Sequence, residues 1–419
     1  MVLAGQVAGA LEGVGLVRAS LLVTRGGGVL MAALVCVAAA GIVPAGPAAA
    51  TTVRVGPAAL AAPLGPQGTL FDVSAASAKD VWAVGCTGSS ECAQPLAVHW
   101  DGRSWAGAPF TGGTGGDVLL GVAAASPRDA WAVGFRGSKT LIVHWDGRSW
   151  TQVPSPSPLP GNNVNSLTSV AVVSARDAWA VGYYGTPATT LIVHWDGRSW
   201  TQVPSPSPIP SPPAAGDYLF GVAAVSARGA WAVGWYGRKT LIVHWDGRSW
   251  AQVPSPSPAQ HSPFAGDALY DVAATSARDA WAAGSTLSHS KTLIVHWNGT
   301  SWAQMPSPTP PRFAGAGSTL TSVAAASPRS AWAVGATGVD PSYKHLIERW
   351  TGGAWNLVHP RVPGLGPGWV LQDVAAASAR SAWAVGYTGS YYPLILHWDG
   401  LTWTQAPLPA ASLTPPHAR

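Results

Sequence analysis

Histidines recur in this 419-residue sequence with a regularity that could serve a metal site or acid–base chemistry. Six of them stand immediately before a tryptophan, about 50 residues apart with one copy skipped: His99, His144, His194, His244, His296 and His397. A metal ion needs three or four ligands within about 2 Å, and one histidine per distant copy cannot supply them. We therefore expect no metal and no cofactor, and interpret each ring as neutral and hydrogen-bonded to a neighbouring turn.

The copy that lacks this histidine holds the remaining candidates for catalysis, Glu348 and His345, with Arg349 in the histidine's place. Hydrolysis by two carboxylates needs a second one about 5–9.5 Å away, and the sequence offers no obvious partner. Glu348 beside Arg349 is more readily explained as an ion pair. We therefore expect a binding protein rather than an enzyme. An extracellular hydrolase or lyase acting on polysaccharide, with Glu348 and His345 in its site, is the alternative.

Aromatic and basic residues gather in segments that differ from copy to copy. The candidate ligand-binding residues are Phe135, Tyr183, Tyr184, Trp235, Tyr236, Arg238, Tyr343, Tyr387, Tyr391 and Tyr392. Variable loops of this composition on a rigid scaffold are typical of a binding surface. They predict recognition of a glycan or another extracellular or cell-surface polymer. Two alternatives stay open: the aromatic side chains cap the core, or the chain is a structural scaffold for protein partners.

A repeat of about 50 residues, present in seven copies, must position these residues. In the second copy the expected strands A to D are Val122–Ser126, Ala130–Val133, Leu141–Trp145 and Trp150–Val153. The Asp146-Gly147 pair between strands C and D is a tight hairpin signal. Such a period indicates a solenoid or a propeller. Four antiparallel strands repeated seven times predict an all-β fold, a seven-bladed β-propeller of four-stranded antiparallel blades.

The composition agrees with this fold. Only 10% of the residues are charged, and 21 of the 23 tryptophans recur once per strand B, C and D in every copy. Strand A carries small residues, so the tryptophans would fill the wedge between blades that widens outward from the axis. We therefore interpret the repeated tryptophans as core, not as sugar-stacking platforms. The Pro-Ser-Pro-Ser-Pro segments are expected to connect each strand D to the next strand A, where proline suits a chain leaving a sheet edge.

The run Ala130-Trp131-Ala132-Val133-Gly134, followed by His144-Trp145-Asp146-Gly147-Arg148-Ser149-Trp150, carries a family resemblance. It resembles secreted bacterial propeller repeats related to the kelch and galactose-oxidase superfamily, over about residues 70–407. The Asp-Gly-Arg-Ser-Trp turn is also similar to the Asp-box of sialidase-like propellers. The resemblance implies the propeller fold; neither family's catalytic residues can be matched to positions of this sequence.

Strand alternation predicts that the A–B and C–D turns share one face and the B–C loops the other. The first face would carry 11 basic residues and nine aspartates, which we interpret as a structural Arg–Asp ladder rather than an anion site. The overall formal charge of +5 is scattered, without a Lys/Arg run. We therefore expect no nucleic-acid partner. We also expect a monomer.

The first 50 residues are predicted to be a signal peptide. Arg18 and Arg25 precede an uncharged stretch of 16 residues, 28–43, and Ala48–Ala50 fits a cleavage site; an uncleaved anchor is the alternative. The other expected segments are a lead-in at 51–69, the propeller at 70–407 and a tail at 408–419. The chain would be secreted, free or associated with the cell surface, with no membrane contact after cleavage. In an oxidising compartment Cys86 and Cys92 are expected to form a local disulfide; two unpaired thiols are the alternative.

Overall fold

The computed structural model describes residues 67–88, 92, 94–108, 110–111, 116–208, 216–258, 266–286, 291–308, 317–338, 343–360, 362, 365 and 368–408. The predicted signal peptide, nearly all of the lead-in and residues 409–419 of the tail lie outside these ranges. Every regular element in them is a β-strand. No helix long and apolar enough to cross a membrane occurs in the part of the chain that the structure describes.

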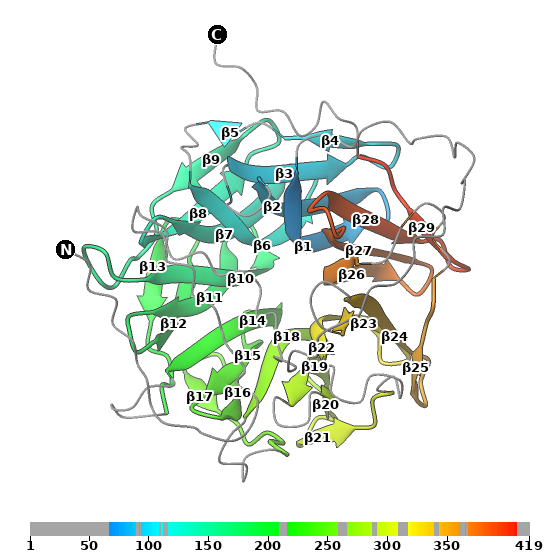
Figure 1. Ribbon diagram of the computed structural model, residues 1–419. Coiled ribbons are helices and arrows are strands. Elements are labelled where there is room, and N and C mark those ends of the chain that lie inside the picture. The colour runs from blue at the N-terminus through cyan, green and yellow to red at the C-terminus, as the bar shows by residue number, and fades with distance from the viewer. Residues whose placement is uncertain are drawn as a thin grey trace, which may run out of the picture.

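Seven antiparallel sheets surround a central axis, which confirms the predicted seven-bladed propeller (Figure 1). The innermost strands are β1 (Gly68–Ser77), β6 (Asp117–Ser126), β10 (Asn165–Ser174), β14 (Asp217–Ser226), β18 (Asp267–Ser276), β22 (Ser318–Ser327) and β26 (Val370–Ser378). The second strands are β2 (Asp80–Thr87), β7 (Asp129–Arg136), β11 (Asp177–Tyr184), β15 (Gly229–Tyr236), β19 (Asp279–Thr286), β23 (Ser330–Thr337) and β27 (Ser381–Tyr387). The third strands are β3 (Gln94–Trp100), β8 (Lys139–Trp145), β12 (Thr189–Trp195), β16 (Lys239–Trp245), β20 (Lys291–Trp297), β24 (Lys344–Trp350) and β28 (Pro393–Trp398). The outermost strands are β4 (Trp105–Gly107), β9 (Trp150–Val153), β13 (Trp200–Val203), β17 (Trp250–Gln252), β21 (Trp302–Met305), β25 (Trp355–Leu357) and β29 (Trp403–Gln405). The second blade gains a short edge strand, β5 (Phe110–Thr111), which pairs with β9 in parallel.

The inner strands are longer than the sequence predicted. In the second blade β6 begins five residues before the expected start at Val122. Its pairing with β7 shifts between Leu119 and Gly121, and every other inner strand has a register shift at the equivalent place. A bulge of this kind interrupts the alternation of inward and outward side chains, so the first half of each strand A does not read as one continuous strand.

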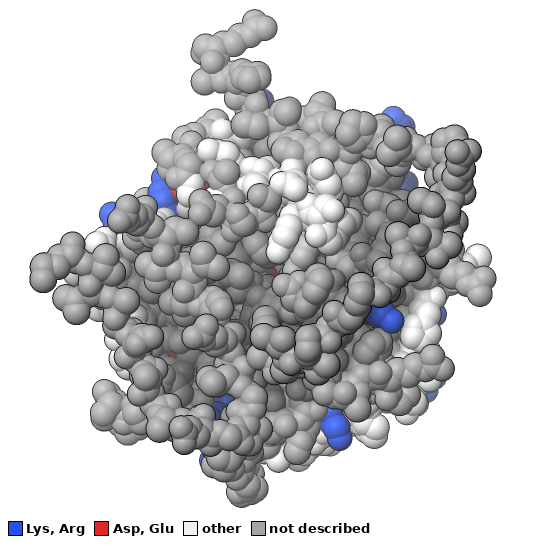
Figure 2. All heavy atoms as spheres, in the orientation of Figure 1, with Lys and Arg blue, Asp and Glu red and all other residues white. Residues whose placement is uncertain are grey.

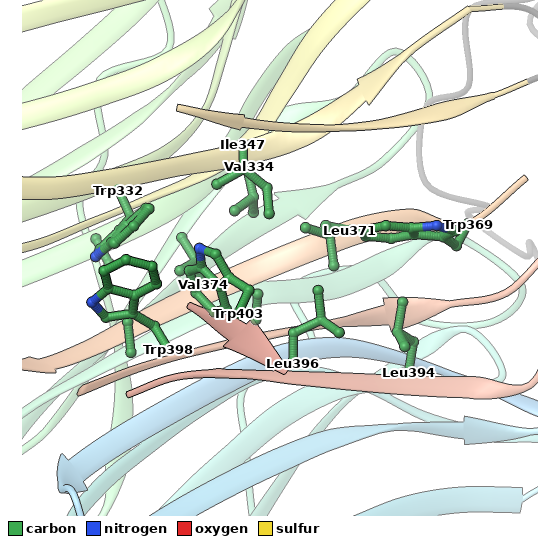
Figure 3. Close-up of a cluster of buried hydrophobic side chains, with 13 residues drawn as sticks. Trp332, Val334, Ile347, Trp369, Leu371, Val374, Leu394, Leu396, Trp398 and Trp403 are labelled. Carbon is green, nitrogen blue, oxygen red and sulfur yellow. The ribbon is translucent and has the colours of Figure 1, made fainter. Parts of the chain in front are cut away.

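Tryptophans form the core between blades, as predicted. Trp82 packs edge-on against Trp150 of the next blade, with 5.1 Å between ring centroids, and tilted against Trp145 at 4.8 Å. The same arrangement recurs at all seven interfaces, and Figure 3 shows one of them, where Trp332 meets Trp398 and Trp403. Since each strand B tryptophan contacts two tryptophans of the following blade, three per copy are needed to fill every wedge.

The recurrent histidines also have a structural role. Each stacks on the strand B tryptophan of its own blade, with 4.0–4.3 Å between centroids. In four blades the ring Nε2 also lies 2.6–2.8 Å from an aspartate oxygen of the A–B turn: His99 with Asp80, His144 with Asp129, His194 with Asp177 and His296 with Asp279. The prediction of histidines bonded to neighbouring turns is confirmed for these four.

The described parts of the proline-rich segments are hydrogen-bonded to their own blades. The hydroxyls of Thr140 and Ser155 lie 2.8 Å apart, and Thr140 also donates to the carbonyl of Pro156 at 2.7 Å. The pair recurs as Thr190 with Ser205, Thr240 with Ser255, and Thr292 with Ser307. A threonine at the start of each of these third strands therefore anchors the chain that leaves the same blade.

The ring closes without an exchanged strand, because the first and seventh blades are each built from one continuous segment. Trp383 of the seventh blade packs against Trp100 and Trp105 of the first, and Leu408 joins the same buried cluster. The N–H of Gly68 donates to the carbonyl of Tyr391 at 2.7 Å. Closure thus depends on side-chain packing and on backbone contacts at one rim.

Candidate ligand-binding site

The B–C loops and the D–A connectors lie on one face of the ring, hereafter the loop face. The N–H of Asp217, at the start of an inner strand, donates to the carbonyl of Ala188 in the preceding B–C loop, and Asp267 and Arg238 repeat this contact. The A–B and C–D turns share the opposite face, the turn face, where each A–B cation lies against a C–D glycine. The predicted distribution of loops and turns is therefore correct.

A pocket opens on the loop face between the second and third blades. Its aromatic walls are Phe135 and Tyr183, and its other lining residues are Gly137, Ser138, Asn162, Val164, Asn165 and Ser166. Its cavity volume is about 10 Å³, which is about the space that one water molecule needs. Asn165 is held in place by a side-chain amide that donates to the carbonyl of Ser138 at 2.8 Å. The pocket is therefore a shallow depression with two buried aromatic walls, and the amide of Asn162 is exposed at its rim.

An aromatic strip continues from this pocket across the third, fourth and fifth blades. Tyr183 meets Tyr218 edge-on at 4.8 Å, and Tyr218 stacks on Trp235 at 5.4 Å. Tyr218 also stacks on Phe220 at 5.9 Å, and Phe220 lies 5.7 Å from Tyr270 of the next blade. Tyr183 is buried, and the other four remain partly exposed. Burial raises the pKa of both Tyr183 and Tyr218 above the ordinary value of a tyrosine.

Three members of the strip were not predicted: Tyr218, Phe220 and Tyr270. They belong to the inner strands β14 and β18, and Phe220 and Tyr270 are the bulged residues themselves. The sequence predicts a strand A that begins after this point and carries small residues. Tyr218 was the clearest signal, because the other copies carry Thr, Val, Ser or Ala at its position. At the bulged position the signal is weaker, since the first copy also has an aromatic residue there, Phe71.

The other predicted binding residues divide into two groups. Tyr184 and Tyr236 pack against the buried clusters between blades, so they cap the core. Arg238 is exposed beside the start of β18. Tyr387 and Tyr391 stack on each other at 5.4 Å on the seventh blade, and Tyr391 is 46% exposed.

Tyr343 and Tyr392 are partly buried, in the B–C loops of the sixth and seventh blades. The N–H of Tyr392 donates to the hydroxyl of Thr388 at 3.2 Å. The structure therefore divides the predicted surface: Phe135, Tyr183 and Trp235 belong to one continuous site, whereas the residues of the sixth and seventh blades lie apart from it.

Glu348 and His345 do not form an open site. Glu348 is completely buried in β24, and Ser307 donates to both of its carboxylate oxygens at 3.0 Å. Burial raises the pKa of Glu348 to about 8. The expected pairing with Arg349 is wrong, because the guanidinium of Arg349 lies over the rings of Trp332 and Trp398.

His345 stacks on Trp369 at 3.6 Å, and burial lowers its pKa to about 4. It is therefore neutral at physiological pH. Both side chains of the alternative catalytic site are thus held by packing against their neighbours.

Cys86 and Cys92 form the predicted disulfide, across the B–C loop of the first blade. Within the described residues, no group of three or more His, Cys, Asp or Glu side chains is placed to hold a metal ion.

Three buried or half-buried carboxylates interact electrostatically near the axis: Asp72, Asp271 and Asp373. They occupy the same position, directly after the bulge, in the inner strands of the first, fifth and seventh blades. Asp373 accepts a hydrogen bond from the N–H of Val73 at 2.7 Å, across the closing seam. Asp271 accepts from the hydroxyl of Ser322 at 2.9 Å, and Asp72 accepts from the next blade at 2.7 Å. Burial, reinforced by repulsion from Asp373, raises the pKa of Asp271 to about 7 and also raises that of Asp72. These side chains form hydrogen bonds between neighbouring blades, but their burial close to one another disfavours the charged carboxylate.

No family model and no curated protein matches this chain. Among solved structures it is similar to YCF48 bound to a D1 peptide, with 15% identity over 80% of this chain and 95% of that chain, and a TM-score of 0.50. The chain has a β-propeller fold. It is also similar to the BP39L lectin of Burkholderia pseudomallei, at 15% identity over 82% and 99% of the two chains with a TM-score of 0.49. The propeller domain of Cps50 (Swd1) from Myceliophteria thermophila shares 11% identity over 80% and 97%, also with a TM-score of 0.49. The kelch and Asp-box resemblances stay predictions.

Proposed function

We propose that this chain is an extracellular binding module that recognises a neutral glycan on its loop face. The observation that carries the proposal is the continuity of the pocket with the aromatic strip through Tyr183. The partly exposed aromatic surface of Tyr218 and Trp235 suits the apolar face of a sugar ring, and the exposed amide of Asn162 at the pocket suits its hydroxyls. The strip extends over three blades, which favours an extended chain of sugars over a single one.

Charge supports a neutral ligand. Arg136 directly follows the pocket residue Phe135, and its guanidinium binds both carboxylate oxygens of the buried Asp117 at 2.6 Å. It is therefore neutralised by an ion pair rather than offered to a ligand. In the view of Figure 2, the visible Lys and Arg side chains are scattered and do not gather in one patch. Export is supported by the predicted signal peptide and by the disulfide, which persists in oxidising compartments.

A glycan array with the full-length protein, followed by titration of the best ligand, tests the proposal. Trp235→Ala and Tyr218→Ala should each weaken binding roughly tenfold or more, as expected for partly buried aromatic anchors. Tyr391→Ala is the matched control, because Tyr391 is an exposed aromatic residue outside the strip; it should change affinity less than about twofold. Unchanged binding by the Trp235 and Tyr218 variants would overturn the site.

A peptide partner is the second candidate. The observation in its favour is the fold shared with YCF48, which has been solved with a bound peptide, and aromatic grooves also bind extended peptides. A peptide library in the same titration separates the two: tight binding of a peptide that depends on Trp235, with no glycan bound, would favour a protein partner.

A further inference from the structure

Each A–B turn on the turn face ends in one basic residue. These seven residues, hereafter the cation ring, are Lys79, Arg128, Arg176, Arg228, Arg278, Arg329 and Arg380. All seven are exposed. The A–B turns join the two strands nearest the axis, so the cation ring lies inside the circle formed by the C–D turns.

Every member of the cation ring is held in the same way. The backbone N–H of Arg128 donates to the hydroxyl of Ser126 at 3.3 Å, and the equivalent bond is present in the other six blades. The stem of Arg128 lies against Gly147 of the C–D turn, where a Cβ would come within 3.0 Å of its Cγ. The same contact with a C–D glycine recurs in all seven blades. The stems are therefore ordered before any ligand arrives.

The carboxylates of this face are engaged elsewhere, so the predicted Arg–Asp ladder is wrong. The A–B aspartates Asp80, Asp129, Asp177 and Asp279 bind histidines. The C–D aspartates accept backbone N–H groups of their own turns: Asp146, for example, accepts from Arg148 at 2.9 Å and from Ser149 at 3.0 Å. These bonds lower the pKa of Asp146. Among the described residues, no ion pair joins a member of the cation ring to an acidic side chain.

The positive charge is concentrated on the inner turns. The A–B turns carry the seven cations against four aspartates, whereas the C–D turns carry four arginines against five aspartates. Six of the seven ring members are arginine, whose planar guanidinium forms paired hydrogen bonds with phosphate or carboxylate oxygens.

We propose that the cation ring is a second binding surface, for a linear polymer that carries phosphate groups along its length. The side chains of the cation ring are exposed, so affinity would come from several weak contacts made together. Seven equivalent contacts arranged in a circle suit a flexible chain that crosses several blades. With the loop face on the opposite side, the rigid disc could then hold two polymers at once.

Polyphosphate binding by the full-length protein, measured calorimetrically in about 0.1 M salt, tests this proposal. The variant Arg128→Gln/Arg176→Gln/Arg228→Gln keeps the stem atoms that pack on the glycines and removes three ring charges. It should bind roughly tenfold more weakly, at a factor of two to three per exposed ion pair. The control Arg148→Gln/Arg198→Gln/Arg248→Gln removes three charges from the C–D turns of the same blades, and should lose less than threefold.

Three outcomes would overturn the proposal: no binding of polyphosphate by the unmodified protein, equal losses in the two triple variants, or tighter binding of polyglutamate than of polyphosphate at equal length. Equal losses would mean that only the overall charge of the face matters. Thermal unfolding of both variants verifies that they fold. The result is independent of the glycan proposal, because the ring variants leave the loop face intact and should bind its ligand unchanged.

Discussion

Glu348 stands where the other six blades carry valine or leucine, and replacing it by valine should stabilise the protein in a pH-dependent way. The equivalent residues are Val98, Val143, Val193, Val243, Val295 and Leu396. Glu348 is completely buried and its pKa is raised from 4.5 to about 8. The folded protein therefore retains the proton over a range in which the unfolded chain has lost it. The stabilisation that comes from the raised pKa of Glu348 is fully present below pH 4.5 and is lost as the pH rises toward 8.

The size of the effect follows from the shift. One pKa unit corresponds to about 1.4 kcal/mol, so the decline between pH 4.5 and 8 has an upper limit of about 5 kcal/mol, of which about 3 kcal/mol is lost by pH 7. Valine does not titrate. Relative to the unmodified protein, Glu348→Val should therefore gain about 3 kcal/mol on going from pH 4.5 to 7. For a propeller of about 340 residues this corresponds to roughly 4 °C in Tm.

Scanning calorimetry of both proteins between pH 4.5 and 8 measures this difference. Glu348→Gln is the control, because it keeps an acceptor for the hydroxyl of Ser307 but does not titrate; it should flatten the pH profile as valine does. Ser307→Ala should steepen the profile, since it removes the hydrogen bond that favours the charged carboxylate. Parallel Tm profiles for the glutamate, glutamine and valine proteins would refute the reasoning, because they would show that Glu348 titrates normally in the fold.

Three further predictions concern the axis, the closing seam and the first loop. Asp271→Asn should raise Tm at pH 8 but not at pH 4, since the asparagine keeps the acceptor for Ser322 without a charge held at a raised pKa; calorimetry at the two pH values measures this. Trp383→Ala should lower the free energy of unfolding, measured in urea, by about 3–5 kcal/mol. Trp179→Ala should lower it by the same amount within about 1 kcal/mol, because both interfaces have the same tryptophan packing. A much smaller loss at Trp383 would contradict closure of the ring by side-chain packing. Reducing the disulfide should lower the free energy of unfolding by about 2 kcal/mol, the loop-closure value for so short a loop, as measured by urea unfolding with and without reductant.

Most of the fold could be predicted because the same pattern of strand and turn residues recurs in every copy of the repeat. Strand pairs with short turns form locally, and three tryptophans per copy can be buried only between neighbouring blades. The described strands therefore match the expected order in every copy. The strand starts were less predictable, because the bulge near Leu119 and its equivalents breaks the alternation on which strand assignment depends.

The candidate site was predicted in part. Trp235 and Tyr183 were predicted because they are large aromatic residues at a position that differs between copies. The structure places them at the end of strand B, in β15 and β11, and not in a B–C loop as expected. Tyr218, Phe220 and Tyr270 lie on inner strands, and only the pairing of β14 with β15 shows that Tyr218 faces Trp235. The sequence analysis also paired Glu348 with its neighbour Arg349. Glu348 and Arg349 are adjacent along β24, so their side chains point to opposite faces of the sheet. Glu348 therefore accepts from Ser307, before the blade, and Arg349 lies over Trp398 of the next blade.

By itself the sequence determined the blade: its four strands, its tryptophan core, the histidine that stacks within it, and the face on which each loop emerges. These depend on contacts within one copy or on contacts repeated identically between copies. Tertiary structure alone decided the contacts that the repeat pattern does not state. Asp72, Asp271 and Asp373 interact near the axis, Glu348 is buried against Ser307, and no ion pair among the described residues includes a member of the cation ring. The physical reason is that closing seven copies into a ring brings together residues far apart in the chain. Their burial, charge and hydrogen bonds depend on which blades become neighbours, and not on the local pattern of any one copy.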